Sequence, residues 1–370
     1  MLLERKKELV PENIRELKPY IAGKTITEVV ETYQPPKISK LASNENRLGC
    51  SPKVKDAVLD ALRNIQDYPD PISRKLKKKL ASRLNVKPEN IVIGSGSESV
   101  ISMITKAFFN NDDEAITADV TFLGFRIQAS IRGIKLQQLP LTEDYRFDLQ
   151  AILDSINEYT KMIYIANPNN PTGTYITRPE FESFIKQVPE DVLVVMDEAY
   201  FEFSKDLSDF PDSLSYKFDN VLTLRTFSKA YGLAGFRIGY GVGHEDLIST
   251  LHKVKLTFEP TTLAQAAALA ALDDEDFLNK TRNMVSKGRQ RLYSFFERNH
   301  ITYVPTYSNA VMIVFPTEDE AITFTQEMLK KGVILRRLGG FGMPNGVRIT
   351  IGTDEELDHF EKSFEEIYKW

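Results

Sequence analysis

The stretch LRTFSKAYGLAGFRIGYG, residues 224–241, places Lys229 on a turn of small residues. The run before it, residues 221–224, is continuously apolar and is expected to form a short buried strand. A lysine on a tight turn at a strand end can hold its amine in a dry pocket, where burial lowers the amine pKa and makes it a nucleophile. The stretch therefore predicts a reactive amine at the edge of a sheet.

The polar side chains around Lys229 are suited to binding phosphate. Thr226 and Ser228 supply hydroxyl donors, and the planar guanidinium of Arg237 matches phosphate oxygens. A nucleophilic lysine beside a phosphate clamp points to pyridoxal phosphate. Any single lysine is more often solvated than catalytic, and Lys and Arg make up 47 of the 370 residues, so this interpretation depends on the rest of the chain.

The composition is that of an ordinary globular protein with room for two domains, since 42% of the 370 residues are hydrophobic and 27% are charged. A net charge of −5 gives no reason to expect a nucleic-acid partner. The single cysteine, Cys50, excludes an internal disulfide and fits a reducing compartment. We find no apolar run of membrane-spanning length and no signal-peptide core, so we expect no membrane association and a cytoplasmic location.

Short apolar strands alternate with helices through the first two thirds of the chain. We expect strands at residues 90–93, 114–117, 134–139, 162–166, 192–196 and 221–224, and helices at 52–64, 74–84, 100–109, 120–130, 148–156, 179–186 and 244–254. This alternation predicts a mainly parallel, doubly wound α/β sheet, with the ligand beyond the carboxyl ends of the strands. Before it we expect a helical arm (4–20), an extended segment, and a loop at the polar triplet 44–46, which follows the apolar entry 37–43.

Polar motifs follow three of these strands. Residues 94–99, GSGSES, form a glycine-rich turn into a helix, which presents unpaired N–H groups to an anion. Residues 167–173, NPNNPTG, predict a rigid loop whose asparagine amides can bond a ligand. Asp197 follows the buried run VLVVM and needs a cation or a donor, a need that a protonated pyridine nitrogen would satisfy.

The C-terminal part is expected to be α+β. A long helix at residues 277–299 precedes strands at 310–315, 333–335 and 347–351 and helices at 318–330 and 354–368. Arg336 and Arg348 lie at or near strand ends, where they could meet a substrate anion. We predict an N-terminal arm that joins the small domain (1–40), a large cofactor-binding domain (41–280) and a small C-terminal domain (281–370).

The lysine turn, NPNNPTG, DEAY (197–200) and RITIGT (348–353) together resemble the fold-type I pyridoxal-phosphate aminotransferases, and within them the histidinol-phosphate aminotransferases. The resemblance covers nearly the whole chain, from LKPYIAGK (17–24) and LASNEN (41–46) to RITIGT. It implies pyridoxal 5'-phosphate as cofactor, no metal, and a homodimer with shared active sites.

The resemblance also implies a role for each matching residue. Lys229 matches the lysine that forms a Schiff base with the cofactor and moves the proton, and Asp197 matches the partner of the pyridine nitrogen. Tyr200 completes the implied catalytic set as a donor to the phenolic oxygen of the cofactor. The other implied cofactor contacts are Asn170 at the same oxygen, Phe122 on the ring face, Ser97, Glu98, Thr226, Ser228 and Arg237 at the phosphate, and Tyr68 at the phosphate of the neighbouring subunit.

On the substrate side, Arg348 matches the arginine that binds the carboxylate of glutamate or the phosphate of histidinol phosphate. Arg336 matches a second anion-binding arginine, and Tyr20, Asn44 and Asn170 complete the implied substrate contacts. Two positions depart from the family pattern: Arg47 and Arg337 stand where proline is common. These departures concern loop shape and substrate preference.

The implied reaction transfers the amino group of L-histidinol phosphate to 2-oxoglutarate and gives imidazole acetol phosphate and glutamate, a step of histidine biosynthesis. An aminotransferase for phenylalanine or tyrosine is the first alternative, and a decarboxylase or lyase with the same cofactor is the second. A non-catalytic binding protein that keeps the fold is a third, against which the intact Lys229, Asp197 and Tyr200 argue.

Overall fold

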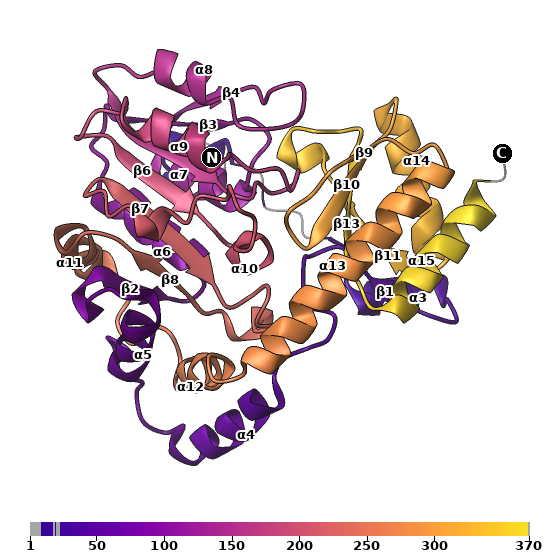
Figure 1. The fold of residues 1–370 in the computed structure, drawn as a ribbon, viewed down its shortest axis with the longest axis horizontal. Coiled ribbons are helices and arrows are strands. Elements are labelled where there is room, and N and C mark those ends of the chain that lie inside the picture. The colour runs from indigo at the N-terminus through magenta and orange to yellow at the C-terminus, as the bar shows by residue number, and fades with distance from the viewer. Residues whose placement is uncertain (1–8, 18, 20–22, 369–370) are drawn as a thin grey trace.

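The computed structural model describes residues 9–17, 19 and 23–368, and a 7-stranded sheet in the order β2-β8-β7-β6-β5-β3-β4 forms the centre of its larger part (Figure 1). The strands are β2 (Ile91–Gly94), β3 (Glu114–Ala118), β4 (Lys135–Leu139), β5 (Thr160–Ala166), β6 (Leu193–Asp197), β7 (Val221–Thr226) and β8 (Gly239–Val242). Strands β3 to β7 pair in parallel, whereas β8 runs antiparallel to β2 and β7. The predicted mainly parallel sheet is confirmed.

Helices cover both faces of this sheet, and the alternation along β2 shows why. Ile91 and Ile93 pack into one buried apolar cluster, while Val92 between them packs into another. The helices of this part are α4 (Pro52–Ala61), α5 (Arg74–Leu84), α6 (Ser97–Ala107), α7 (Leu123–Arg132), α8 (Leu149–Asp154), α9 (Arg178–Ile185), α10 (Phe201–Ser204), α11 (Glu245–Val254) and α12 (Thr262–Ala271).

Strand β8 was not predicted, because four residues that include Gly239 and Gly241 carry no alternation of apolar and polar side chains. It pairs back on β7, so the lysine turn between them lies at the carboxyl end of β7. Gly239 also lies against the start of α6, where a Cβ would overlap the backbone nitrogen of Ser97. The strand thereby brings the lysine turn and the start of α6 together.

The smaller part is built on a 4-stranded antiparallel sheet in the order β12-β13-β10-β9. Its elements are α13 (Glu275–Arg298), β9 (Tyr303–Val304), β10 (Ala310–Val314), α14 (Glu318–Lys330), β11 (Val333–Ile334), β12 (Arg336–Arg337), β13 (Gly346–Thr350) and α15 (Asp354–Ile367). A separate apolar cluster, rich in phenylalanine, forms its core. Helix α13 runs from the larger part into the smaller one (Figure 1). Leu41 belongs to this second cluster, and the division at residues 40 and 280 stays a prediction.

The N-terminal segment differs from the prediction. A helix, α3 (Ile26–Tyr33), takes the place of the expected extended segment, and Thr25 and Glu28 form a capping box at its start. The apolar entry to the expected loop, residues 37–43, contains β1 (Ser39–Lys40), which pairs in parallel with β11, and residues 44–46 form neither helix nor strand, as expected. Of the expected helical arm, the described residues contain α2 (Glu12–Arg15). Among all described residues, no helix combines the length and apolar character needed to cross a bilayer.

Gly232 fixes a close approach between the lysine turn and the segment before α4. Its φ is +72°, and a Cβ there would overlap the carbonyl oxygen of Gly49. We expect Gly232→Ala to lower the free energy of unfolding by at least about 2 kcal/mol, because a positive φ and a steric overlap add. Denaturant unfolding measures this, with Gly235→Ala as control, since a Cβ at 235 meets no atom within 4 Å. Equal stability of the two variants would contradict the expectation.

Candidate active site

A cavity of about 240 Å³ lies at the carboxyl ends of the parallel strands. It is lined by each residue of this chain for which a contact with its own cofactor was predicted: Ser97, Glu98, Phe122, Asn170, Asp197, Tyr200, Thr226, Ser228, Lys229 and Arg237. The remaining wall residues, which were not predicted, are Ser43, Glu45, Ala166, Pro168, Ala199 and Ala234. The folded chain therefore gathers residues from five separate motifs into one site.

Lys229 is a buried amine in the wall of this cavity. Burial lowers its pKa to about 8, and the positive charges of Arg348 and Arg237 act in the same direction. The carboxylates of Glu45 and Asp197 oppose that shift. The amine nitrogen lies 5.9 Å from the ring centroid of Tyr200. An amine with this pKa is partly unprotonated near neutral pH, as a nucleophile or a general base must be.

Asp197 ends β6 and is only 3% exposed. Its Oδ2 accepts a hydrogen bond of 2.5 Å from the hydroxyl of Tyr164, and its Oδ1 accepts one of 3.2 Å from the backbone of Ala199. Burial raises the pKa of Asp197, and the two hydrogen bonds and the charge of Lys229 oppose the rise. A cationic ring in the cavity would favour the ionised carboxylate further.

Tyr164 was not predicted to belong to the site. It lies on β5, is fully buried, and its ring stacks on Phe125 with centroids 4.2 Å apart. Burial raises the pKa of Tyr164 well above its usual value, so its hydroxyl keeps its proton and donates to Asp197. The available sequence signal was one hydroxyl-bearing residue in an otherwise aliphatic strand, MIYIA, beside the strand that ends in Asp197.

The opposite end of the cavity offers donors to an anion. Helix α6 begins at Ser97, and no side chain caps its first N–H groups. Arg237 lies beside this end, with Nη1 3.5 Å from the Ser228 hydroxyl and Nη2 3.6 Å from a Glu98 carboxylate oxygen. A Cβ on Gly96 would come within 2.7 Å of Nη2, so glycine is needed for this approach. Backbone N–H groups, a hydroxyl and a guanidinium converge here as phosphate recognition requires.

Asn44 and Arg348 lie behind the cavity wall, each bonded to a wall residue. The Asn44 amide donates to the Tyr200 hydroxyl over 2.7 Å. Arg348 donates to the Asn170 side-chain oxygen over 2.5 Å and to the Ala42 carbonyl over 2.8 Å. Burial raises the pKa of Tyr200, so the phenol stays protonated and can donate. Both predicted substrate residues are thus one hydrogen bond away from predicted cofactor residues.

Arg336 lies opposite Arg348 in the pairing of β12 with β13, and both guanidinium carbons lie 5.7 Å from the ring centroid of Phe341. Tyr68, in contrast, does not line the cavity of its own chain. Its side chain is 79% exposed, and its ring stacks on Phe258 with centroids 4.3 Å apart. Tyr20 lies outside the described residues.

Comparison with known proteins agrees with this geometry. The family model "Aminotransferase class I and II" matches residues 36–364. Histidinol-phosphate aminotransferase 2 of Carboxydothermus hydrogenoformans is 41% identical over 95% of this chain and 97% of its own length. The corresponding protein of a Geobacillus species is 40% identical over 96% of this chain and 97% of its own length.

Among solved structures, histidinol-phosphate aminotransferase of Sinorhizobium meliloti, in complex with pyridoxal-5'-phosphate, superposes with a TM-score of 0.89, at 27% identity and with 97% of each chain covered. The match of the family model and the identity of these relatives show the family. The chain belongs to the class I and II aminotransferases.

The amine of Lys229 is expected to react at an unusually low pH. In the protein without cofactor, reductive methylation of Lys229 should follow a midpoint near its pKa of about 8, because burial disfavours the charged amine. Peptide mass spectrometry across a pH series measures the midpoint, and exposed lysines in the same sample are the control. The variant Arg348→Met should move the midpoint upward, since it removes a positive charge. A Lys229 midpoint that matches the exposed lysines would refute the shift.

Proposed function

We propose that this member of the class I and II aminotransferases transfers the amino group of L-histidinol phosphate to 2-oxoglutarate, giving imidazole acetol phosphate and glutamate. The protein is a fold-type I enzyme that uses pyridoxal 5'-phosphate. The observation that carries the substrate assignment is an identity of 40 to 41% with histidinol-phosphate aminotransferases over nearly the whole chain. The cavity supports it with an amine, a buried carboxylate and an anion-binding end.

The residues present fit the cofactor. Its phosphate would lie at the start of α6 with Arg237 and Ser228, and its ring nitrogen would face Asp197. Phe122 and Ala199 line the same cavity and would contact the ring. When bound, pyridoxal phosphate supplies an electron sink that stabilises the carbanion left by loss of a substrate proton. Asp197 keeps that sink effective if it stays ionised, and the hydrogen bonds from Tyr164 and Ala199 favour the ionised form.

Lys229 is the base that this site offers. With a pKa of about 8, the amine can take a proton from the substrate carbon, or return one to it, at near-neutral pH. Tyr200 and Asn170 would hold the phenolic oxygen in place, because a hydroxyl and an amide donate hydrogen bonds to it. Ping-pong kinetics are expected, because the holoenzyme would keep the amino group of the donor until the keto acid binds.

The substrate anion is assigned to the arginine pair. Arg348 is 5% exposed and held by Asn170 and the Ala42 carbonyl, so its guanidinium has a fixed orientation. Arg336 lies beside it across β12 and β13. Two adjacent guanidinium groups can bind the phosphate of histidinol phosphate or a carboxylate of glutamate. The shared anchor allows one site to serve both half-reactions.

A homodimer with shared active sites is part of the proposal, as is a cytoplasmic location. Large apolar residues near Tyr68 or near its ring partner Phe258 in sequence are exposed: Leu59, Ile65 and Leu256 are 65%, 58% and 66% exposed. Exposure of several large apolar side chains favours a covering partner. The exposed Tyr68 is then available to reach the phosphate end of the neighbouring cavity.

Single-turnover spectra test the substrate. We expect the holoenzyme to react with histidinol phosphate at least about 100-fold more efficiently than with phenylalanine or phosphothreonine, because only the first offers both a phosphate for the arginines and an imidazole ring. The loss of the visible cofactor band measures each half-reaction. Preference for phenylalanine would instead identify an aromatic amino acid aminotransferase, and release of carbon dioxide would identify a decarboxylase.

Hybrid dimers test the shared site. A Tyr68→Phe subunit mixed with a Lys229→Ala subunit should form one site with neither change and one site with both, because Tyr68 acts on the partner's cavity. Cofactor affinity and turnover should therefore recover to about half of the wild-type capacity in the hybrid. If the hybrid recovers nothing beyond the two parent homodimers, Tyr68 acts within its own subunit.

A further inference from the structure

Glu45 is a wall residue of the cavity to which the proposed function gives no role. Two other carboxylates line the cavity, and both have assigned partners: Asp197 accepts from Tyr164, and Glu98 faces Arg237. The Oε1 of Glu45 accepts a hydrogen bond of 2.8 Å from Lys40. Its Oε2 is buried and accepts no hydrogen bond from any residue within the described part of the chain. An acceptor left in this state costs free energy that a ligand donor would recover.

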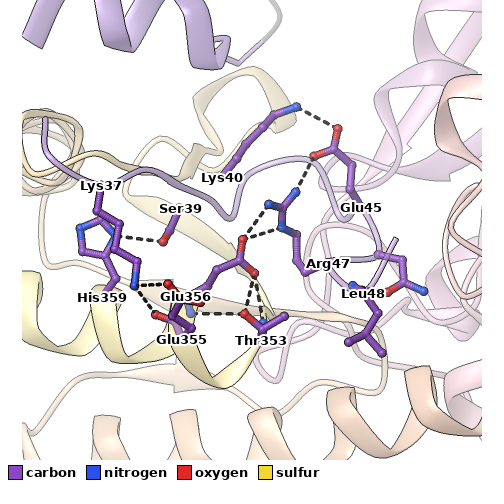
Figure 2. A network of polar contacts seen from close by, with 11 residues as sticks. Lys37, Ser39, Lys40, Glu45, Arg47, Leu48, Thr353, Glu355, Glu356 and His359 are labelled. Atoms are coloured by element: carbon purple, nitrogen blue, oxygen red, sulfur yellow. Dashed lines mark hydrogen bonds and ion pairs between the residues drawn. The ribbon is translucent and has the colours of Figure 1, made fainter. Parts of the chain in front are cut away.

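The Glu45 carboxylate is held in place by two cations. Figure 2 shows Lys40 on one oxygen and Arg47 facing the other, with Nη1 of Arg47 4.0 Å from Oε2. Arg47 is itself fixed, since its Nε and Nη2 both lie 2.7 Å from Oε1 of Glu356 (Figure 2). Glu356 caps the start of α15 through Thr353. A series of charged contacts, from Glu45 through Arg47 to Glu356, thus joins the cavity wall to the smaller part.

The backbone on each side of Glu45 is also fixed. Asn44 bonds the Tyr200 hydroxyl and receives the Asn309 amide on its carbonyl over 3.0 Å. Asn46 donates to the carbonyl of Ala230, next to Lys229, over 2.9 Å. Since both neighbours are buried and bonded, Glu45 occupies one position relative to the cavity. Such preorganisation is what a recognition residue requires.

We propose that Glu45 is a specificity-determining residue whose carboxylate accepts a hydrogen bond from a ring N–H of the amine substrate. This inference rests on the proposed function. An imidazole ring titrates near neutral pH, so a fixed carboxylate favours its protonated form and binds it with a charge-assisted bond. A phenyl ring offers no donor and leaves the carboxylate oxygen unsatisfied. Arg47, which stands where related enzymes commonly have proline, acts as a positioning residue for Glu45.

The test compares both half-reactions of the holoenzyme of Glu45→Gln. We expect kcat/KM for histidinol phosphate to fall about 10- to 100-fold, because a charge-assisted hydrogen bond becomes a neutral one, while kcat/KM for glutamate changes less than about 3-fold. The dissociation constant of pyridoxal phosphate, measured by absorbance, should stay within about 3-fold of wild type. Arg47→Met should reproduce part of the loss for histidinol phosphate.

A comparison of the two half-reactions distinguishes recognition of the substrate ring by Glu45 from an effect of the Glu45 charge on Lys229. Glu45 also raises the pKa of Lys229, and that influence would change both half-reactions alike. Equal losses in both, or no loss in either, would overturn the assignment. Glu355→Gln is the matched control, since Glu355 pairs with Lys37 in the same network, is 79% exposed and does not line the cavity. A wild-type enzyme inert toward histidinol phosphate would overturn the proposed function itself.

Discussion

Asp197 and Lys229 bury opposite charges at the carboxyl ends of β6 and β7, and each eases the burial of the other. The two strands are parallel neighbours, with Asp197 paired to Leu224, so the carboxylate and the lysine turn arise on adjacent strands at one edge. Burial alone would neutralise both groups. The hydrogen bonds from Tyr164 and Ala199 and the charge of Lys229 favour the ionised carboxylate. Burial lowers the Lys229 pKa to about 8 although Asp197 opposes the shift, so part of the amine is unprotonated near neutral pH.

The segment from Asn44 to Arg47 extends this constraint to the smaller part. Asn44 donates to the Tyr200 hydroxyl, and Asn46 donates to the carbonyl of Ala230, next to Lys229. Arg47 pairs with Glu356 of α15. The position of this wall segment is therefore set by contacts with residues far from it in sequence. With the role proposed for Glu45, substrate preference would depend on the helix that carries Glu356 as well as on the residues in the wall.

The sequence was sufficient to predict site residues where a reactive or polar residue type directly follows a predicted strand. Short motifs at strand ends, and the family resemblance that they carry, led to residues that line the cavity, because parallel strands bring their carboxyl ends to one edge. Strand β8 could not be predicted, because its sequence, GYGV, shows no alternation of apolar and polar residues. Its Gly239 instead allows the close approach of α6. Tyr164 and Glu45 were missed for a different reason: their importance comes from partners across the sheet or across the two parts, Asp197 and Arg47, which no local pattern reveals.

The pairing of β1 with β11 has a consequence for how the chain is made. Residues 39 and 40 leave the ribosome early, yet their hydrogen-bonding partners, residues 333 and 334, emerge after the whole central sheet. The large sheet can assemble during translation, whereas the small unit must wait for nearly the last residues. The early N-terminal segment is thus left without its sheet through most of synthesis, and a polypeptide truncated before β11 would expose that edge to chaperones and proteases.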